Sequence, residues 1–169
     1  GKGPLRLVLD TGASRSALTP AALAKLGITP DFDRTVMLRG TTGSARVPTV
    51  RVGRVEIGDL LAERQTMVVV DDAFGGADGV LATTTLRDRR ILADFRRDRI
   101  EIVRSGGQRA PSGFNTLPIK LLERHVPWVD AMVGNVRVKA VIDTGSQQTL
   151  GNLALRDALE RSRRGAEPR

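Results

Sequence analysis

The tripeptide Asp-Thr-Gly occurs twice in this chain of 169 residues, starting at Asp10 and at Asp143, each time directly behind an apolar run. Shifting the first copy by 133 positions, the separation of the two aspartates, also brings Thr19 onto Asn152. Threonine and asparagine are both good helix N-caps. The repeated unit is therefore a strand, an Asp-Thr-Gly turn and a capped helix, which predicts two duplicated lobes.

The composition is that of a folded protein without a membrane span. Hydrophobic residues make up 40% of the chain, enough for a core. The apolar runs, such as residues 68–70 and 138–142, are far shorter than the roughly 18 to 20 residues that cross a bilayer. The chain has no cysteine, which excludes a disulfide framework and a thiol nucleophile.

The chain is strongly basic, with 27 Lys and Arg against 19 Asp and Glu and a net charge of +8. A basic surface attracts nucleic acid. However, the arginines are scattered, and aromatic residues are only 3% with no tyrosine, so a base-stacking platform is hard to build. We therefore expect a solvated arginine-rich surface and no specific nucleic-acid partner.

The first hundred residues predict a mainly β lobe with one short helix. Thr19 as N-cap, Pro20 at the first helical position and Gly27 as a stop bracket a helix over residues 21–26. Strands over residues 35–38 and 47–52 flank a turn-rich stretch and predict a hairpin. Further strands are expected over residues 4–9, 55–57, 65–70, 91–95 and 100–103.

The rest of the chain predicts a linker and a shorter second lobe. Breaker residues fill positions 105–113, so we divide the chain into a first lobe (1–104), a linker (105–113), a partial second lobe (114–160) and a basic, frayed tail (161–169). Within the second lobe we expect strands over 115–122, 128–133 and 136–142 and a helix over 153–159.

The two aspartates suggest acid-base chemistry. A carboxylate at the end of a buried strand raises its pKa or finds a partner. Two carboxylates that share a site hold one proton between them over a broad pH range, so one can take a proton from water while the other donates to a carbonyl oxygen. Asp10 and Asp143 are therefore the predicted catalytic pair for peptide hydrolysis, without a metal, a cofactor or a covalent intermediate.

Each aspartate is followed by residues that can support it. Glycine allows a tight turn and brings its amide close to the carboxylate, a threonine hydroxyl can bond the opposite turn, and a serine can contact an outer carboxylate oxygen. A single Asp-Thr-Gly is also simply a good β-turn, but two copies in the same context favour a functional role. The predicted supporting residues are Thr11, Gly12, Ser14, Thr144, Gly145 and Ser146.

These motifs resemble the retropepsin-like (retroviral-type) aspartic proteases of bacteria. The resemblance rests on Leu-Asp-Thr-Gly-Ala-Ser, the capped helix, the glycine-containing hairpin, Asp-Gly-Val-Leu at 78–81 and Ala-Asp-Phe at 93–95; it covers residues 3–103 and resumes over 128–160. It implies closed β-barrel lobes, one catalytic aspartate from each of two lobes, a polypeptide substrate and a flap. The flap tip would lie at Thr41, Thr42 and Gly43. Such relatives suggest the bacterial cell envelope or periplasm, while the sequence leaves the location open.

Two departures from the family pattern stand out. Ala82 takes a position where the family usually has glycine, and its β-carbon is expected to distort the support for Asp10. Only 26 residues follow Asp143, so the second lobe lacks its own flap hairpin and closing strand. The chain is then a fragment, has a naturally reduced second lobe, or uses a second copy for the missing half.

Three interpretations follow. We favour a dyad of Asp10 with Asp143 inside one chain, because the linker and repeat allow a pseudo-twofold arrangement. The alternatives are a homodimer that pairs Asp10 from two chains, and a catalytically inactive binding or dimerisation module of the same fold. Other candidates are weak: the acidic stretch 71–78 does not match an EF-hand, and His125 has no cysteine or second histidine for a zinc site.

Overall fold

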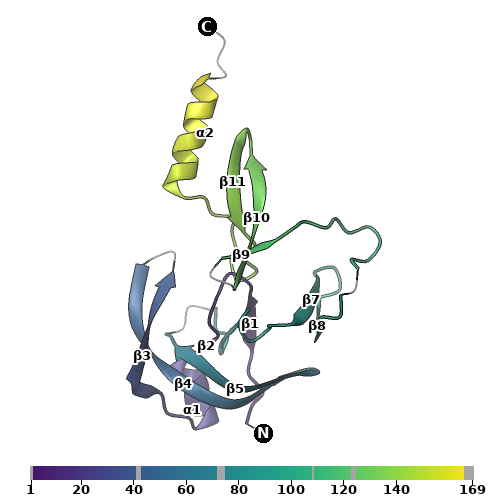
Figure 1. Ribbon diagram of the computed structural model, residues 1–169. Helices are drawn as coiled ribbons and strands as arrows, with labels where there is room; N and C mark the ends of the chain where they lie inside the picture. The colour runs from purple at the N-terminus through teal and green to yellow at the C-terminus, as the bar shows by residue number, and fades with distance from the viewer. Residues whose placement is uncertain (1, 41–42, 72–74, 108, 123–124, 166–169) are drawn as a thin grey trace.

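The computed structural model describes residues 2–40, 43–71, 75–107, 109–122 and 125–165. The chain is mainly β, as predicted, with a curled half-barrel sheet in keeping with retropepsin-like lobes. Figure 1 shows the sheet of the first lobe at one end of the molecule and the last strands and helix projecting from the other. No helix in the described ranges is long and apolar enough to cross a membrane.

The first lobe is built on a six-stranded sheet in the order β1-β6-β2-β5-β4-β3. Its β1–β6 and β2–β5 pairs are parallel, whereas its β2–β6, β4–β5 and β3–β4 pairs are antiparallel. The strands are β1 (Leu7–Asp10), β2 (Ala17–Leu18), β3 (Asp31–Gly40), β4 (Gly43–Ile57), β5 (Leu60–Val69) and β6 (Gly79–Ala82).

Helix α1 (Pro20–Leu26) packs against this sheet and begins and ends at the predicted residues. The Thr19 hydroxyl accepts a hydrogen bond from the Ala22 N–H at 3.1 Å. Gly27 ends the helix with φ 58° and ψ 44°, a left-handed conformation that glycine adopts without strain. The apolar face of α1 is buried with Leu18, Val50, Met67 and Val69, which forms the main core cluster.

The predicted hairpin is present but longer than the sequence indicated. Strands β3 and β4 pair along their length, from Asp31 opposite Thr49 to Gly40 opposite Gly43. The register shifts between Asp31 and Thr35. Strand β4 then continues through the two expected segments without a break and pairs with β5 from Ile57 to Thr49. Glycine at position 53 did not interrupt the strand, because cross-strand pairing outweighs local propensity.

The central strands lie unusually close together around Gly79. A β-carbon at Gly79 would lie 2.1 Å from the Ala17 carbonyl oxygen, so only glycine fits this crossing. The parallel pairing of β1 with β6 runs unbroken from Leu7–Gly79 to Asp10–Ala82. Ala82 is fully buried in this ladder. The expected distortion from its β-carbon is therefore not seen.

The remaining elements form two small sheets and one helix. Strands β7 (Arg89–Asp94) and β8 (Arg99–Arg104) make a hairpin, and a connection without helix or strand in its described part leads from β8 to β9. The second sheet has the order β11-β10-β9, with β9 (Lys120–Leu122), β10 (Val126–Val133), β11 (Val136–Val141) and then helix α2 (Leu153–Gly165).

Two expectations for this part of the chain need correction. The strand expected over 115–122 is reduced to β9, because Pro118 has no N–H for a ladder and β10 pairs only with residues from Lys120 onward. The tail expected to fray from residue 161 is helical as far as Gly165. Arginines favour a helix and are stabilised near its C-terminus, where Arg163 and Arg164 lie.

The second part of the chain carries little core of its own. Of its described residues beyond 104, Val129 alone is buried, and α2 has no buried residue. Large apolar side chains in this part of the chain are exposed, among them Leu150 and Leu153 at 69% and 68%.

Candidate active site

The two Asp-Thr-Gly turns meet and exchange hydrogen bonds. Thr11 Oγ1 donates to the Ile142 carbonyl at 2.6 Å, and Thr144 Oγ1 donates to the Leu9 carbonyl at 2.7 Å. Each hydroxyl also accepts the N–H of the other threonine at 3.1 Å. Thr144 is the equivalent of Thr11 and Ile142 the equivalent of Leu9, each 133 positions further along, so the contacts obey the pseudo-twofold relation of the sequence repeat.

The aspartates face the opposite glycines across this junction. A β-carbon at Gly12 would lie 2.5 Å from Asp143 Cγ, and one at Gly145 would lie 2.6 Å from Asp10 Cγ. Each carboxylate also accepts a backbone hydrogen bond from its own turn at 2.9 Å, Asp10 from Ala13 and Asp143 from Gly145. The absence of side chains at both glycines therefore gives the two carboxylates room to approach.

The environment of Asp10 favours its protonated form. Burial raises the pKa of Asp10 above its ordinary value of 3.8, and the negative charge of the nearby Asp143 raises it further. The N–H groups of Ala13 and Gly12 act in the opposite direction by stabilising the carboxylate. The balance is a carboxyl group that keeps a proton to higher pH than an isolated aspartate.

A buried polar cluster supports the first turn from behind. Ser16 Oγ accepts the N–H of Ala82 at 2.9 Å and lies 2.9 Å from Thr85 Oγ1. The hydroxyl and N–H of Thr83 both reach the Ala13 carbonyl, at 3.1 and 3.4 Å. These contacts tie the Asp10 turn to β6 and the segment after it, a role that the sequence alone did not indicate.

Asp78 anchors the base of the lobe and lies outside the site. Its carboxylate accepts hydrogen bonds from Lys25 Nζ at 2.6 Å and from the Arg6 N–H at 2.8 Å. The bond from Lys25, followed by that from Arg6, lowers the pKa of Asp78 below its ordinary value of 3.8. The charged form of this buried loop residue is therefore part of the folded structure.

The two predicted supporting serines behave differently from the expectation. Ser146 Oγ donates to the Gln148 carbonyl at 2.7 Å and so stabilises its own loop. Within the described part of the chain, Ser14 makes no hydrogen bond to the Asp10 carboxylate but lines the neighbouring cleft. Backbone N–H groups hold the carboxylates instead, that of Ala13 at Asp10 and that of Gly145 at Asp143.

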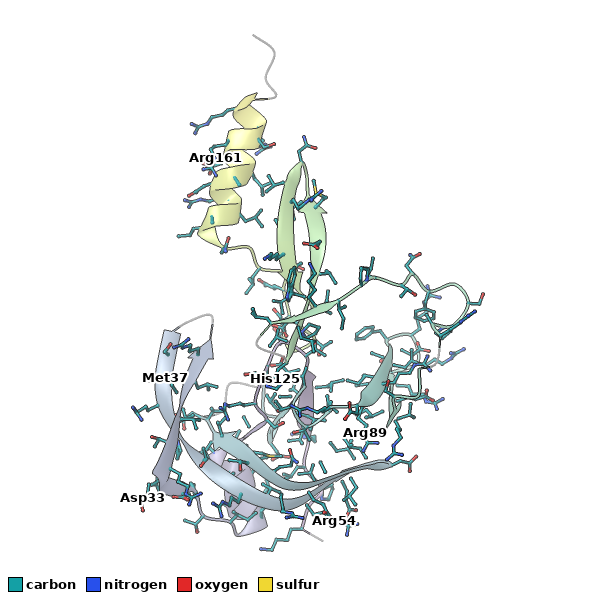
Figure 2. All side chains as sticks on the ribbon, viewed as in Figure 1. Asp33, Met37, Arg54, Arg89, His125 and Arg161 are labelled. Carbon is teal, nitrogen blue, oxygen red and sulfur yellow. The ribbon has the colours of Figure 1, made fainter. Side chains whose placement is uncertain are left out.

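A cleft of about 700 Å³ opens beside the Asp10 turn. Figure 2 shows Met37 on the β3–β4 hairpin and His125 just before β10, which approach the cleft from different elements. The lining residues come from the first turn, the hairpin, β5, the segment after β6 and the start of the second sheet: Gly12, Ser14, Arg15, Met37, Leu38, Arg39, Gln65, Thr66, Thr84, Leu122, His125 and Val126.

The hairpin was predicted to carry the flap. Thr41 and Thr42 lie outside the described residues. Gly43 begins β4 with φ 140°, a conformation that L side chains rarely adopt, and a β-carbon there would meet nothing within 4 Å. The sequence analysis did not identify Arg15, Gln65 and His125 as cleft residues, because a cleft built from distant segments leaves no local pattern. Of the three, only Arg15 has a signal in the sequence, since it directly follows the first motif.

The described residues include no group of three or more His, Asp or Glu side chains placed to hold a metal ion. A model of the aspartyl protease family matches residues 1–87, just over half of the chain. No curated protein and no solved structure matches the chain.

Proposed function

The chain belongs to the aspartyl protease family, and we propose that it is an aspartic endopeptidase whose catalytic dyad is Asp10 and Asp143 of one chain. Of the six residues predicted to support the dyad, the proposal keeps Thr11, Gly12, Thr144 and Gly145 in that role, places Ser14 at the cleft and leaves Ser146 to its own loop. The proposal includes the division into a first lobe over 1–104 and a partial second lobe over 114–160.

The observation that carries the proposal is the exchange of contacts between the two turns. Thr11 and Thr144 bond each other's strands, and Gly12 and Gly145 each face the opposite carboxylate. Two isolated β-turns would need neither contact. An inactive binding module would also gain nothing from a carboxyl group whose pKa is raised by burial and by a second carboxylate.

The chemistry follows from the shared proton. With one proton on the pair, the ionised carboxylate takes a proton from a water molecule as its oxygen attacks the peptide carbonyl carbon. The protonated carboxyl donates its proton to the carbonyl oxygen at the same time. The resulting diol breaks its C–N bond as the protonated carboxyl donates its proton to the amine nitrogen and the other carboxylate takes a proton from a diol hydroxyl. This releases the amine and carboxylic acid products and leaves one proton on the pair.

The cleft suits an extended polypeptide. It lies between the β3–β4 hairpin and the start of the second sheet, beside Gly12. We propose that the hairpin, with its tip at Thr41, Thr42 and Gly43, closes over the substrate and pairs with its backbone, while pockets on alternate sides take its side chains. Deleting residues 41–44 should abolish cleavage, and unchanged kinetics would contradict this role of the hairpin.

The test of the dyad is cleavage of a diverse peptide mixture between about pH 3 and 8, with products identified by mass spectrometry. The unaltered protein is compared with Asp10→Asn, Asp143→Asn and the control Asp33→Asn, which changes an exposed aspartate on β3. Loss of cleavage in the first two variants alone supports the dyad within one chain.

Two other outcomes favour the alternatives. Loss with Asp10→Asn but not with Asp143→Asn indicates a homodimer that pairs Asp10 from two chains. No cleavage by the unaltered protein, at any pH, indicates the binding or dimerisation module. The observation that favours these alternatives is that Val129 alone is buried among the described residues beyond 104.

A further inference from the structure

The side chains that line the cleft are either basic or uncharged. Arg15 follows the Asp10 turn, Arg39 lies near the end of β3, and His125 precedes β10. No aspartate or glutamate is among the lining residues. Two cationic groups thus reach the cleft from separate elements of the first lobe.

These arginines are available to a ligand. Neither Arg15 nor Arg39 forms an ion pair or a side-chain hydrogen bond with another residue of the described part of the chain, and both are exposed. Elsewhere in the described part of the chain, five arginines do have a carboxylate partner: Arg34, Arg54, Arg97, Arg99 and Arg156. An unpaired guanidinium presents a planar fork of donors that matches a carboxylate.

The negative charge of the dyad gives the positions of Arg15 and Arg39 a consequence for substrate binding. A pair that holds one proton carries about one negative charge, which repels an acidic side chain of a bound peptide. Arg15 and Arg39 place two positive charges in the adjoining cleft, which attract such a side chain. Polar side chains such as Gln65 and Thr84 make up part of the remaining lining. Met37, Leu38 and, from the second sheet, Leu122 make up an apolar part, so an aliphatic side chain has a place beside the basic positions.

We propose that the cleft selects acidic peptides: substrates that carry glutamate or aspartate close to an apolar residue at the cleaved bond, with Arg15 and Arg39 as the specificity-determining residues. This inference rests on the proposed function, since it concerns the same cleft. It goes further by naming the substrate class and the side chains that recognise it.

The test uses pairs of fluorogenic octapeptides that share an apolar centre and differ by Glu or Gln at one flanking position at a time. For at least one position we expect kcat/KM to be about fivefold higher for the Glu peptide, the upper end for a solvent-accessible ion pair. In Arg15→Gln/Arg39→Gln the ratio should fall to about one. The ratio of the two peptides is the readout, so a general loss of activity cancels.

The control variant is Arg51→Gln/Arg137→Gln, which removes the same two positive charges from exposed positions on β4 and β11, outside the cleft lining. It should keep the Glu-to-Gln ratio of the unaltered protein. A ratio that falls equally in this control would show that the net charge of +8 steers acidic peptides without a specific site, and would overturn the proposal. A ratio of one in the unaltered protein, at every position, would overturn it as well.

A binding measurement separates this inference from the proposed activity. The same peptides with a reduced, uncleavable central bond are titrated by fluorescence anisotropy at low and high salt. Tighter binding of the Glu peptide that weakens with salt and disappears in the double arginine variant upholds the acidic preference even if no peptide is cleaved. Equal Kd values for the Glu and Gln peptides would contradict it whether or not the protein is a protease.

Discussion

The two motif glycines provide the most quantitative prediction. Neither Gly12 nor Gly145 has a φ in the left-handed region, so alanine fits the backbone at both positions. The obstacle is the opposite carboxylate: the new β-carbon at Gly12 would lie 2.5 Å from Asp143 Cγ, whereas ordinary contact begins at 3.4 Å. Asp143 must therefore move by about 0.9 Å in Gly12→Ala, and Asp10 by nearly as much in Gly145→Ala.

A displacement of this size acts on catalysis more than on folding. Misplacing a reacting group by about 1 Å costs on the order of a hundredfold in rate, or about 2.7 kcal/mol of activation free energy. We expect kcat to fall by about that factor in each variant. The melting temperature should change little, because the substitution also removes conformational freedom from the unfolded chain.

The assay is kcat on a fluorogenic peptide with a thermal melt of each variant. Gly53→Ala is the matched control: this strand glycine also has no left-handed φ, and its β-carbon would meet nothing within 4 Å. It should leave kcat unchanged. Full activity in a folded Gly12→Ala or Gly145→Ala protein would refute the idea that the two carboxylates are held against the opposite glycines.

Three further predictions concern stability. The pKa of Asp10 is raised in the folded state, so stability falls as pH rises from the ordinary value of 3.8 through the folded value; Asp10→Asn should raise Tm at neutral pH, and its advantage should vanish below about pH 3. The pKa of Asp78 is lowered, so its contribution is present above 3.8 and is lost as pH falls through the folded value; Asp78→Asn should lower Tm at neutral pH, and an equal Tm there would contradict the role of Lys25. Gly79→Ala places a β-carbon 2.1 Å from the Ala17 carbonyl oxygen and should destabilise the protein by at least about 2 kcal/mol in urea unfolding, whereas Gly53→Ala should not.

Features with a local physical cause could be predicted from the sequence. Thr19 and Gly27 bracket α1 as expected, because a cap and a left-handed stop depend on a few neighbouring residues. The mainly β fold and the β3–β4 hairpin were predicted for the same reason. The repeat also indicated that the two turns are equivalent, and their threonines exchange matching hydrogen bonds.

Features that depend on distant contacts could not be predicted. The hydroxyl of Ser146 bonds Gln148 because of the path its loop takes, and Ser16 finds Thr85 only after β2 and β6 have paired. His125 belongs to no sequence motif, and its position in the cleft depends on how the second sheet meets the first lobe. The catalytic pairing of Asp10 with Asp143 stays a prediction.

The measurement that tests the central claim most directly is activity in a mixture of the two inactive variants. Asp10→Asn and Asp143→Asn are assayed separately and then after being unfolded and refolded together, alongside unaltered protein treated in the same way. If each chain builds its own dyad, both variants and the mixture are inactive while the control regains activity. Activity of Asp143→Asn alone, or activity that returns only in the mixture, would show that the dyad is assembled from two chains and would contradict the account.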